Sequence, residues 1–193
     1  MEIIIHQVNK IENLKNIPTK YGVEIDVRTD GSKIILNHDP FNGGDVLRDY
    51  LENYFHGTIV FNIKEAGIET SVLDLAKEFK INSFFLLDVE MPFLFNSAKN
   101  NQKNIAVRFS EYESIELSKY FINSLDWMWI DTVSTLPIND ENKKILSYFK
   151  TCLVCPERWG RKQDIGNYKK ILKSNQIYLD AVMTSLECSG EWF

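Results

Sequence analysis

Two carboxylates with a spacing suited to metal chemistry stand near the start of the chain. Residues 23–28 alternate between apolar and charged side chains, so Glu24 and Asp26 share one face of the strand that this pattern predicts. Two neighbouring carboxylates suit a hard divalent cation, Mg²⁺ or Ca²⁺, because such ions prefer oxygen ligands. A surface strand with one wet face would show the same alternation, so the pattern alone leaves both interpretations open.

Two histidines are candidates to work beside these carboxylates. Residues 29–32 predict a turn, and a second β-branched run at 33–37 then brings His38 back towards the pair. His6 ends a short apolar strand at the N-terminus. Histidine exchanges protons near neutral pH, which makes it the usual general acid or base. We predict that His6 and His38 converge on one pocket, although a structural role for a lone histidine is the alternative.

The order of these elements resembles the glycerophosphodiester phosphodiesterase family and, more loosely, the phosphatidylinositol-specific phospholipases C. That family has a strand ending in His-Arg, a Glu-x-Asp strand, an apolar run ending in His-Asp and a later Glu-x-Lys strand. The corresponding segments here are His6-Gln7, Glu24-Ile25-Asp26, His38-Asp39 and Asn62-Ile63-Lys64.

The resemblance implies a metal-dependent phosphodiester hydrolase. Glu24 and Asp26 would bind the divalent cation, Mg²⁺ or Ca²⁺. The two histidines would exchange protons with the attacking and leaving oxygens. Lys64 would be the third catalytic residue, which neutralises charge on the phosphate, with a solvent-exposed lysine at a strand end as the alternative.

The chain departs from the family at two positions. Gln7 stands where the family has an arginine that holds phosphate, and Asn62 stands where it has a third acidic metal ligand. Asp88 ends the strand that follows the strand of Asn62, so it could supply the missing metal ligand. A helix cap before Met91 is the alternative role for Asp88.

Four residues are candidates for substrate binding: Gln7, Asn62, Arg108 and Glu157. Arg108 is an unusual charge within an apolar strand and could replace the arginine absent at position 7, whereas an ion pair with Glu111 or Glu113 is the alternative. Glu157 follows a strand end in a segment with one aromatic and two basic residues, which suits a substrate loop or a plain surface loop.

Strand-like and helix-like segments alternate along the chain. Strands are predicted at 2–6, 23–28, 57–64, 83–88, 105–110, 127–133, 151–155 and 179–184, and helices at 10–17, 47–54, 69–79, 92–100, 113–121, 140–149 and 164–173. Asp45 could cap the helix at 47–54. Eight such units predict an α/β fold, a compact (β/α)₈ TIM barrel in which the final helix is short or absent, with residues 1–193 forming one domain. In this fold the carboxyl ends of the strands carry the active site. An open doubly wound sheet is the alternative, although no glycine-rich phosphate motif follows the first strand.

Composition narrows the class of protein further. The formal net charge of −5 argues against a nucleic-acid partner, and no apolar run is long enough to span a membrane. The N-terminus shows no secretory signal, and an odd number of cysteines fits a reducing compartment, so we expect a cytoplasmic protein. Cys152 and Cys155 lie within an apolar, strand-like run, which favours buried thiols over a redox pair.

The sequence therefore predicts a metal-dependent hydrolase acting on a small-molecule phosphodiester. A barrel that binds a phosphorylated ligand without hydrolysing it is the alternative, motivated by Gln7 and Asn62. A metal-dependent hydrolase acting on a non-phosphate substrate is a third interpretation.

Overall fold

The computed structural model describes all residues from 1 to 193. The chain divides into two compact units, one of residues Ile4–Leu94 and one of Met1–Ile3 together with Phe95–Phe193. β1 (Glu2–Ile5) contributes residues to both units.

The first unit is built around β2 (Gly22–Asp30), which pairs on both of its edges. One edge pairs in parallel with β5 (Ile59–Ile63), which pairs in turn with β6 (Phe84–Leu87). The other edge pairs in parallel with the end of β1 and then, from Val27 onwards, antiparallel with β3 (Lys33–Leu36). β4 (Asp45–Val46) extends this hairpin.

Both faces of β2 are buried. Val23, Ile25 and Val27 have no exposed surface, and Glu24 and Asp26 on the opposite face are only 1% and 2% exposed. This burial excludes the surface strand with one wet face. Parallel strands in α/β proteins are commonly covered on both faces, so the carboxylates are the exceptional feature of the strand.

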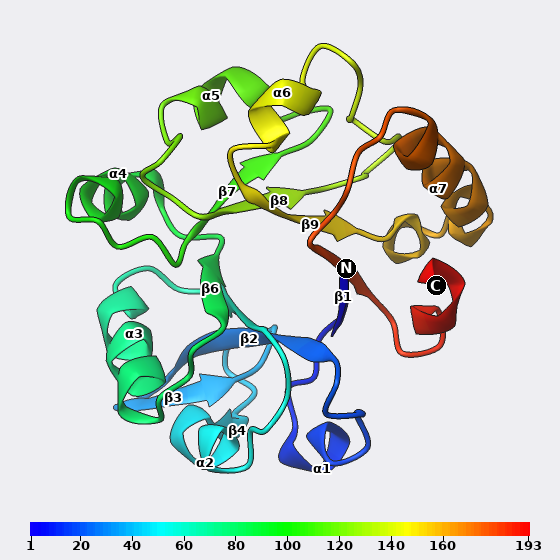
Figure 1. Ribbon diagram of the computed structural model, residues 1–193. Helices are drawn as coiled ribbons and strands as arrows, with labels where there is room; N and C mark the ends of the chain where they lie inside the picture. Colours follow the sequence, from blue (N-terminus) through cyan, green and yellow to red (C-terminus); the bar gives the residue numbers. More distant parts are fainter. The chain divides into compact units, whose positions relative to one another are not determined.

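Four helices belong wholly or partly to this unit: α1 (Ile11–Leu14), α2 (Leu47–Glu52), α3 (Glu69–Glu78) and the start of α4 (Met91–Lys99). Figure 1 shows α1, α2 and α3 on one side of the strands. The prediction that Asp45 caps α2 is wrong, because α2 begins at Leu47 without a side-chain cap and Asp45 lies in β4. Its carboxylate accepts the backbone N–H of Ile11 at 2.7 Å, so it satisfies the first turn of α1 instead.

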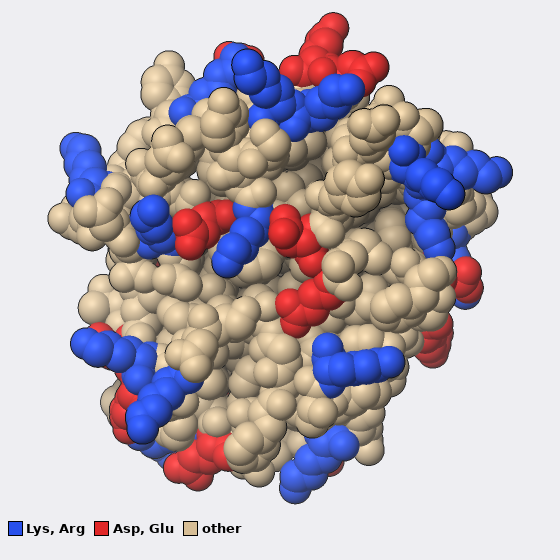
Figure 2. All heavy atoms as spheres, in the orientation of Figure 1, with Lys and Arg blue, Asp and Glu red and all other residues tan.

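The second unit holds four adjacent parallel strands: β7 (Ala106–Phe109), β8 (Trp127–Ile130), β9 (Lys150–Val154) and β10 (Ala181–Thr184). Its helices are α5 (Ile115–Lys119), α6 (Lys143–Leu146) and α7 (Ile165–Ser174), with short 3₁₀ segments η1 (Pro156–Trp159) and η2 (Lys162–Asp164) between β9 and α7. Lys and Arg side chains gather over α7 (Figure 2). All three cysteines are buried and free, as predicted.

One predicted helix of this unit is much shorter than expected. The segment 140–149 forms a helix only at α6, and its start is occupied by side-chain hydrogen bonds to the backbone. Asn142 Oδ1 accepts the N–H of Asn139, and Asn139 Oδ1 accepts the N–H of Glu141, both at 3.0 Å. Asparagine competes with helix formation in this way.

The order of strands and helices confirms the predicted fold class. Eight parallel strands alternate with helices as in a TIM-barrel-like (β/α)₈ fold, and only the 3₁₀ segment η3 (Ser189–Trp192) follows β10. The expected final helix is therefore short. The organisation of residues 1–193 as one domain stays a prediction. None of the helices has the length and apolar character that crossing a membrane requires.

Candidate active site

A cluster of buried polar side chains lies towards the carboxyl ends of β2 and β5. Asp26 and Asn62 are partners in the parallel register of these strands, and Glu24 precedes Asp26 by two residues on the same face. Asn62 is 9% exposed, so all three side chains are removed from water. Buried polar groups need partners, and the partners define the site.

Glu24 is held by three neighbours. Its Oε1 accepts the Nδ2 amide of Asn62 at 2.9 Å, and its Oε2 accepts the backbone N–H of Gln7 at 2.8 Å. His6 Nε2 lies 3.8 Å from the same Oε2. Burial, followed by the negative charge of Asp26, raises the pKa of Glu24 from its ordinary value of 4.5 to about 7, although the hydrogen bonds from Asn62 and Gln7 act in the opposite direction.

Asp26 is held by three side chains. Lys64 Nζ lies 3.2 Å from its Oδ1, and its Oδ2 accepts the side-chain amides of Asn9 at 2.8 Å and Gln7 at 3.2 Å. Gln7 therefore binds the carboxylates through both its backbone and its side chain. Its φ of +56° is in the left-handed region, which costs about 1–2 kcal/mol for a non-glycine residue. The charge-assisted bonds to Glu24 and Asp26 offset this cost.

A gap in one edge of β2 is filled by side chains and loops. β1 pairs with this edge at Gly22 and Val23, and β3 pairs with it from Val27 onwards. Between them, the N–H of Asp26 donates to Asn9 Oδ1 at 2.8 Å, and the carbonyl of Asp26 accepts the N–H of Asn37 at 3.0 Å. Asp26, the central carboxylate of the cluster, thus pairs with β5 on one edge of β2 and with no strand on the other edge.

His38 lies in the loop that follows β3. Arg28 fixes this loop by donating from Nε to the carbonyl of Asn37 at 3.0 Å and from Nη2 to the carbonyl of His38 at 2.8 Å. The imidazole Nδ1 lies 2.8 Å from Asp39 Oδ1. His38 lines a hollow of about 480 Å³ together with Gln7 and Asn9, the two residues that bind Asp26. The convergence of His6 and His38 on one pocket stays a prediction.

Asp88 lies beside Lys64 rather than in a group of metal ligands. Its Oδ2 is 4.0 Å from Lys64 Nζ, and its backbone is in the left-handed region with φ +59°. No three His, Cys, Asp or Glu side chains are arranged together to hold a metal ion. The replacement of the missing ligand by Asp88 therefore stays a prediction.

Asn62 offers a different oxygen to a cation. Its Oδ1 is buried and has no hydrogen-bond partner, while its Nδ2 is committed to Glu24. Amide oxygens are ordinary ligands of Ca²⁺ and Mg²⁺, and carboxylate oxygens that accept one hydrogen bond keep a second lone pair. Glu24, Asp26 and Asn62 thus fit a divalent cation in chemical type, with the Lys64 ammonium as a competing positive charge.

Two predicted substrate-binding residues belong to the second unit. Arg108 donates from Nε to Glu113 at 2.8 Å and also pairs with Asp131, so the ion pair weighed as its alternative role is present. Glu157 Oε1 accepts the hydroxyl of Thr184 at 2.8 Å and the N–H of Ser185 at 2.6 Å. Substrate contact by Arg108 and Glu157 stays a prediction.

The sequence pattern missed Asn9 and Arg28. Asn9 lies in an irregular segment and has no motif around it, so nothing in the sequence distinguishes it from a surface residue. Arg28 shares the face of Glu24 and Asp26 in the alternation of β2, and this parity was the available signal.

Fold and cluster together define a TIM-barrel-like protein with carboxylate, amide and ammonium groups gathered at strand ends. Solved glycerophosphodiester phosphodiesterases have this fold. One, from Agrobacterium tumefaciens str. C58, matches with a TM-score of 0.63 and 11% identity over 95% of this chain and 96% of that chain. Another, from Parabacteroides distasonis ATCC 8503, matches with a TM-score of 0.64 and 12% identity over 94% and 81%. No family model and no curated protein matches the sequence. The fold implied by the resemblance is confirmed.

Proposed function

We propose that the chain hydrolyses small phosphodiesters with the aid of a divalent cation. The observation that carries this proposal is the buried cluster in which Lys64 Nζ lies 3.2 Å from Asp26 and His6 lies 3.8 Å from Glu24. Groups that exchange protons, placed beside a cation that stabilises negative charge, can catalyse attack on a phosphodiester. The fold shared with solved glycerophosphodiester phosphodiesterases supports the same reaction class.

Glu24, Asp26 and the free Oδ1 of Asn62 would hold the cation. The cation, when bound, supplies Lewis acidity that polarises the phosphate. Asp26, which would be one of the ligands, lies beside the Lys64 ammonium, so the chain itself supplies part of the positive charge that attracts an anionic diester.

The reaction transfers a phosphoryl group from one oxygen to another. The attacking oxygen forms a bond to phosphorus while the bond from phosphorus to the leaving oxygen breaks. Water attacks directly, or it opens a cyclic phosphate that a neighbouring hydroxyl of the substrate has formed first. One of His6 and His38 takes the proton from the attacking oxygen, and the other gives a proton to the leaving oxygen. Lys64 stabilises the negative charge that develops on the phosphoryl oxygens.

Turnover of glycerophosphodiesters by the purified chain tests the proposal. We expect hydrolysis in Mg²⁺ or Ca²⁺ and its loss in a chelator. Lys64→Met should lower kcat/KM by about 10²-fold, the usual scale for removing a group that stabilises developing charge. Lys119→Met is the matched control, because Lys119 also pairs with a carboxylate, Glu116, but on an exposed surface. Turnover that persists in a chelator would contradict the requirement for a cation. Full activity of Lys64→Met would contradict the proposal that the buried cluster catalyses the reaction.

A barrel that binds a phosphorylated ligand without turnover is the second candidate. It is favoured by the engagement of Asp26, whose Oδ2 already accepts amides from both Asn9 and Gln7. Saturable binding of a glycerophosphodiester without any hydrolysis, in every cation tried, would support this candidate over the enzyme.

A further inference from the structure

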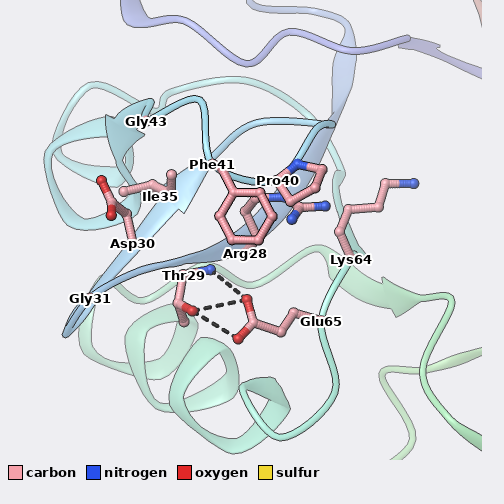
Figure 3. A pocket seen from close by; sticks show the side chains of 10 residues that line it. All are labelled: Arg28, Thr29, Asp30, Gly31, Ile35, Pro40, Phe41, Gly43, Lys64 and Glu65. Atoms are coloured by element: carbon pink, nitrogen blue, oxygen red, sulfur yellow. Dashed lines mark hydrogen bonds between the residues drawn. The ribbon is translucent and has the colours of Figure 1, made fainter.

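A second hollow, which we name the hairpin pocket, opens beside the carboxylate cluster. It has a volume of about 400 Å³ and is lined by β2 and β3 of the hairpin, by the loop after β3 and by Lys64 and Glu65 (Figure 3). This volume is within the range of small-molecule sites. Lys64 belongs to both places, because it lines the pocket and also approaches Asp26 to 3.2 Å.

The charges of the hairpin pocket balance. Arg28 and Lys64 are positive, and Asp30 and Glu65 are negative. Glu65 accepts the N–H of Thr29 at 3.0 Å and its hydroxyl at 2.8 Å, and these bonds hold the pKa of Glu65 below its ordinary value. The carboxylate is therefore ionised at neutral pH and offsets the cations. A pocket with this balance does not select a second anionic group.

The charged groups of the hairpin pocket are suited to binding the hydroxyl groups of a ligand. Arg28 donates from Nε and Nη2 to the loop carbonyls, which leaves its Nη1 to donate to a ligand. The carboxylates of Asp30 and Glu65 accept hydrogen bonds only, so their partner must bring donors. A hydroxyl group both donates and accepts, and several hydroxyls on one molecule satisfy all of these groups at once.

Phe41 adds a flat apolar surface to the pocket. Its side chain is fully exposed and lies beside Pro40 over the pocket (Figure 3). Its φ of +66° is strained for a side chain of this size. The loop is held in this form because Asn37 donates to the carbonyl of Gly43 at 2.7 Å and accepts the N–H of Asp39 at 3.0 Å. The C–H face of a saturated ring packs well on such an aromatic surface.

We infer that the hairpin pocket binds a neutral polyhydroxylated ring, a sugar or a cyclic polyol, carried by the alcohol of the diester. The inference rests on the proposed function in one respect, since it places the ring next to a phosphate at Lys64. It names the substrate class as a diester with a ring-bearing alcohol. Phe41 packs on the ring, and Arg28, Asp30 and Glu65 bind its hydroxyls.

Equilibrium binding to the whole chain tests this inference without requiring turnover. The probes are glycerophosphoinositol, which bears a polyol ring, and glycerophosphoethanol, which is the same diester without a ring. Phe41→Ala should raise the Kd for glycerophosphoinositol by about 2- to 12-fold, the range for aromatic packing, and leave the Kd for glycerophosphoethanol unchanged. Phe55→Ala is the matched control, because Phe55 is an exposed phenylalanine that does not line the pocket. Asp30→Asn should weaken binding of the ring-bearing probe alone.

The outcomes distinguish failure of ring binding in the hairpin pocket from failure of the proposed hydrolysis. Ring-dependent binding that requires Phe41, without hydrolysis of either probe, would support the pocket and contradict the enzyme. Hydrolysis of both probes with equal affinity, unaffected by Phe41→Ala, would support the enzyme and overturn the pocket. Tighter binding of a glycerophosphonucleoside than of glycerophosphoinositol would also overturn it, because the stacked group would then be an aromatic base.

Discussion

Replacing Asn62 with aspartate should make the stability of the chain depend on a divalent cation. The change removes the 2.9 Å hydrogen bond from Asn62 Nδ2 to Glu24 and puts a third carboxylate beside Glu24 and Asp26. The position is only 9% exposed, so water cannot screen the added charge effectively. The three carboxylates would then repel one another unless a cation joins them.

The magnitude follows from these contacts. A lost hydrogen bond to a charged group costs about 1.5–3 kcal/mol, and an unpaired buried charge costs about 3–5 kcal/mol. Part of this cost disappears if one carboxylate takes up a proton, so we expect a loss of about 3–5 kcal/mol at pH 8. For a chain of this size each kcal/mol shifts Tm by about 2–4 °C, which predicts a fall of roughly 10 °C. A cation at one hundred times its Kd restores about 2.7 kcal/mol, or about 5–11 °C.

Thermal unfolding at pH 8, in a chelator and in Mg²⁺ or Ca²⁺, measures this effect. Asn62→Leu is the control, because it removes both the donor to Glu24 and the free Oδ1 and should show no response to the cation. The reasoning is refuted if Asn62→Asp loses the same stability with and without cation. It is also refuted if Asn62→Leu responds as strongly as Asn62→Asp.

Three further predictions concern neighbours of the same cluster. In a chelator, the pKa of Glu24 is about 7 in the folded chain and has its ordinary value of 4.5 in the unfolded chain. The free energy of unfolding should therefore fall by up to about 3 kcal/mol as pH rises from about 4.5 to about 7. Glu24→Gln should abolish this fall in urea unfolding at pH 5 and pH 8, and a fall like that of the wild type would contradict the assignment. His6→Ala and His38→Ala should each lower kcat for a simple phosphodiester by about 10²-fold, and a variant with full activity would remove that histidine from the mechanism. Tyr50→Phe should cost about 1–2 kcal/mol in urea unfolding, because the buried hydroxyl donates to the carbonyl of Val8 at 2.8 Å; an unchanged midpoint would mean that this carbonyl finds another donor.

The sequence predicted the part of the site that depends on local periodicity. Glu24 and Asp26 share a face because side chains alternate along any strand, and this holds whatever surrounds β2. The burial of that face depends on β5 and on the segment after β1, which the alternation does not reveal. The strand and helix order was predicted for the same reason, since eight β/α units are a repeating pattern.

The hydrogen bonds that hold the carboxylates could not be predicted from local periodicity, because their donors come from distant parts of the chain. Asn9 reaches Asp26 across 17 positions, and Asn62 reaches Glu24 across 38. Asn62 was a candidate only through the family pattern, and Asn9 has no sequence feature that distinguishes it from a surface residue. Asp45 was misassigned for a related reason, since it caps a helix 34 positions before it and not the helix that follows.

The gap in the edge of β2 has a consequence for how the chain opens. The N–H of Asp26 donates to the side chain of Asn9 and not to a neighbouring strand, so rotation of that one side chain breaks its hydrogen bond. We expect amides of the β2–β5 ladder to exchange hydrogen when the sheet separates, and the amide of Asp26 to exchange through a more local fluctuation. The backbone at Asp26 can therefore open locally while the sheet stays intact. Its amide is a local reporter of the cluster, and a ligand that orders the segment around Asn9 would slow hydrogen exchange at this one position.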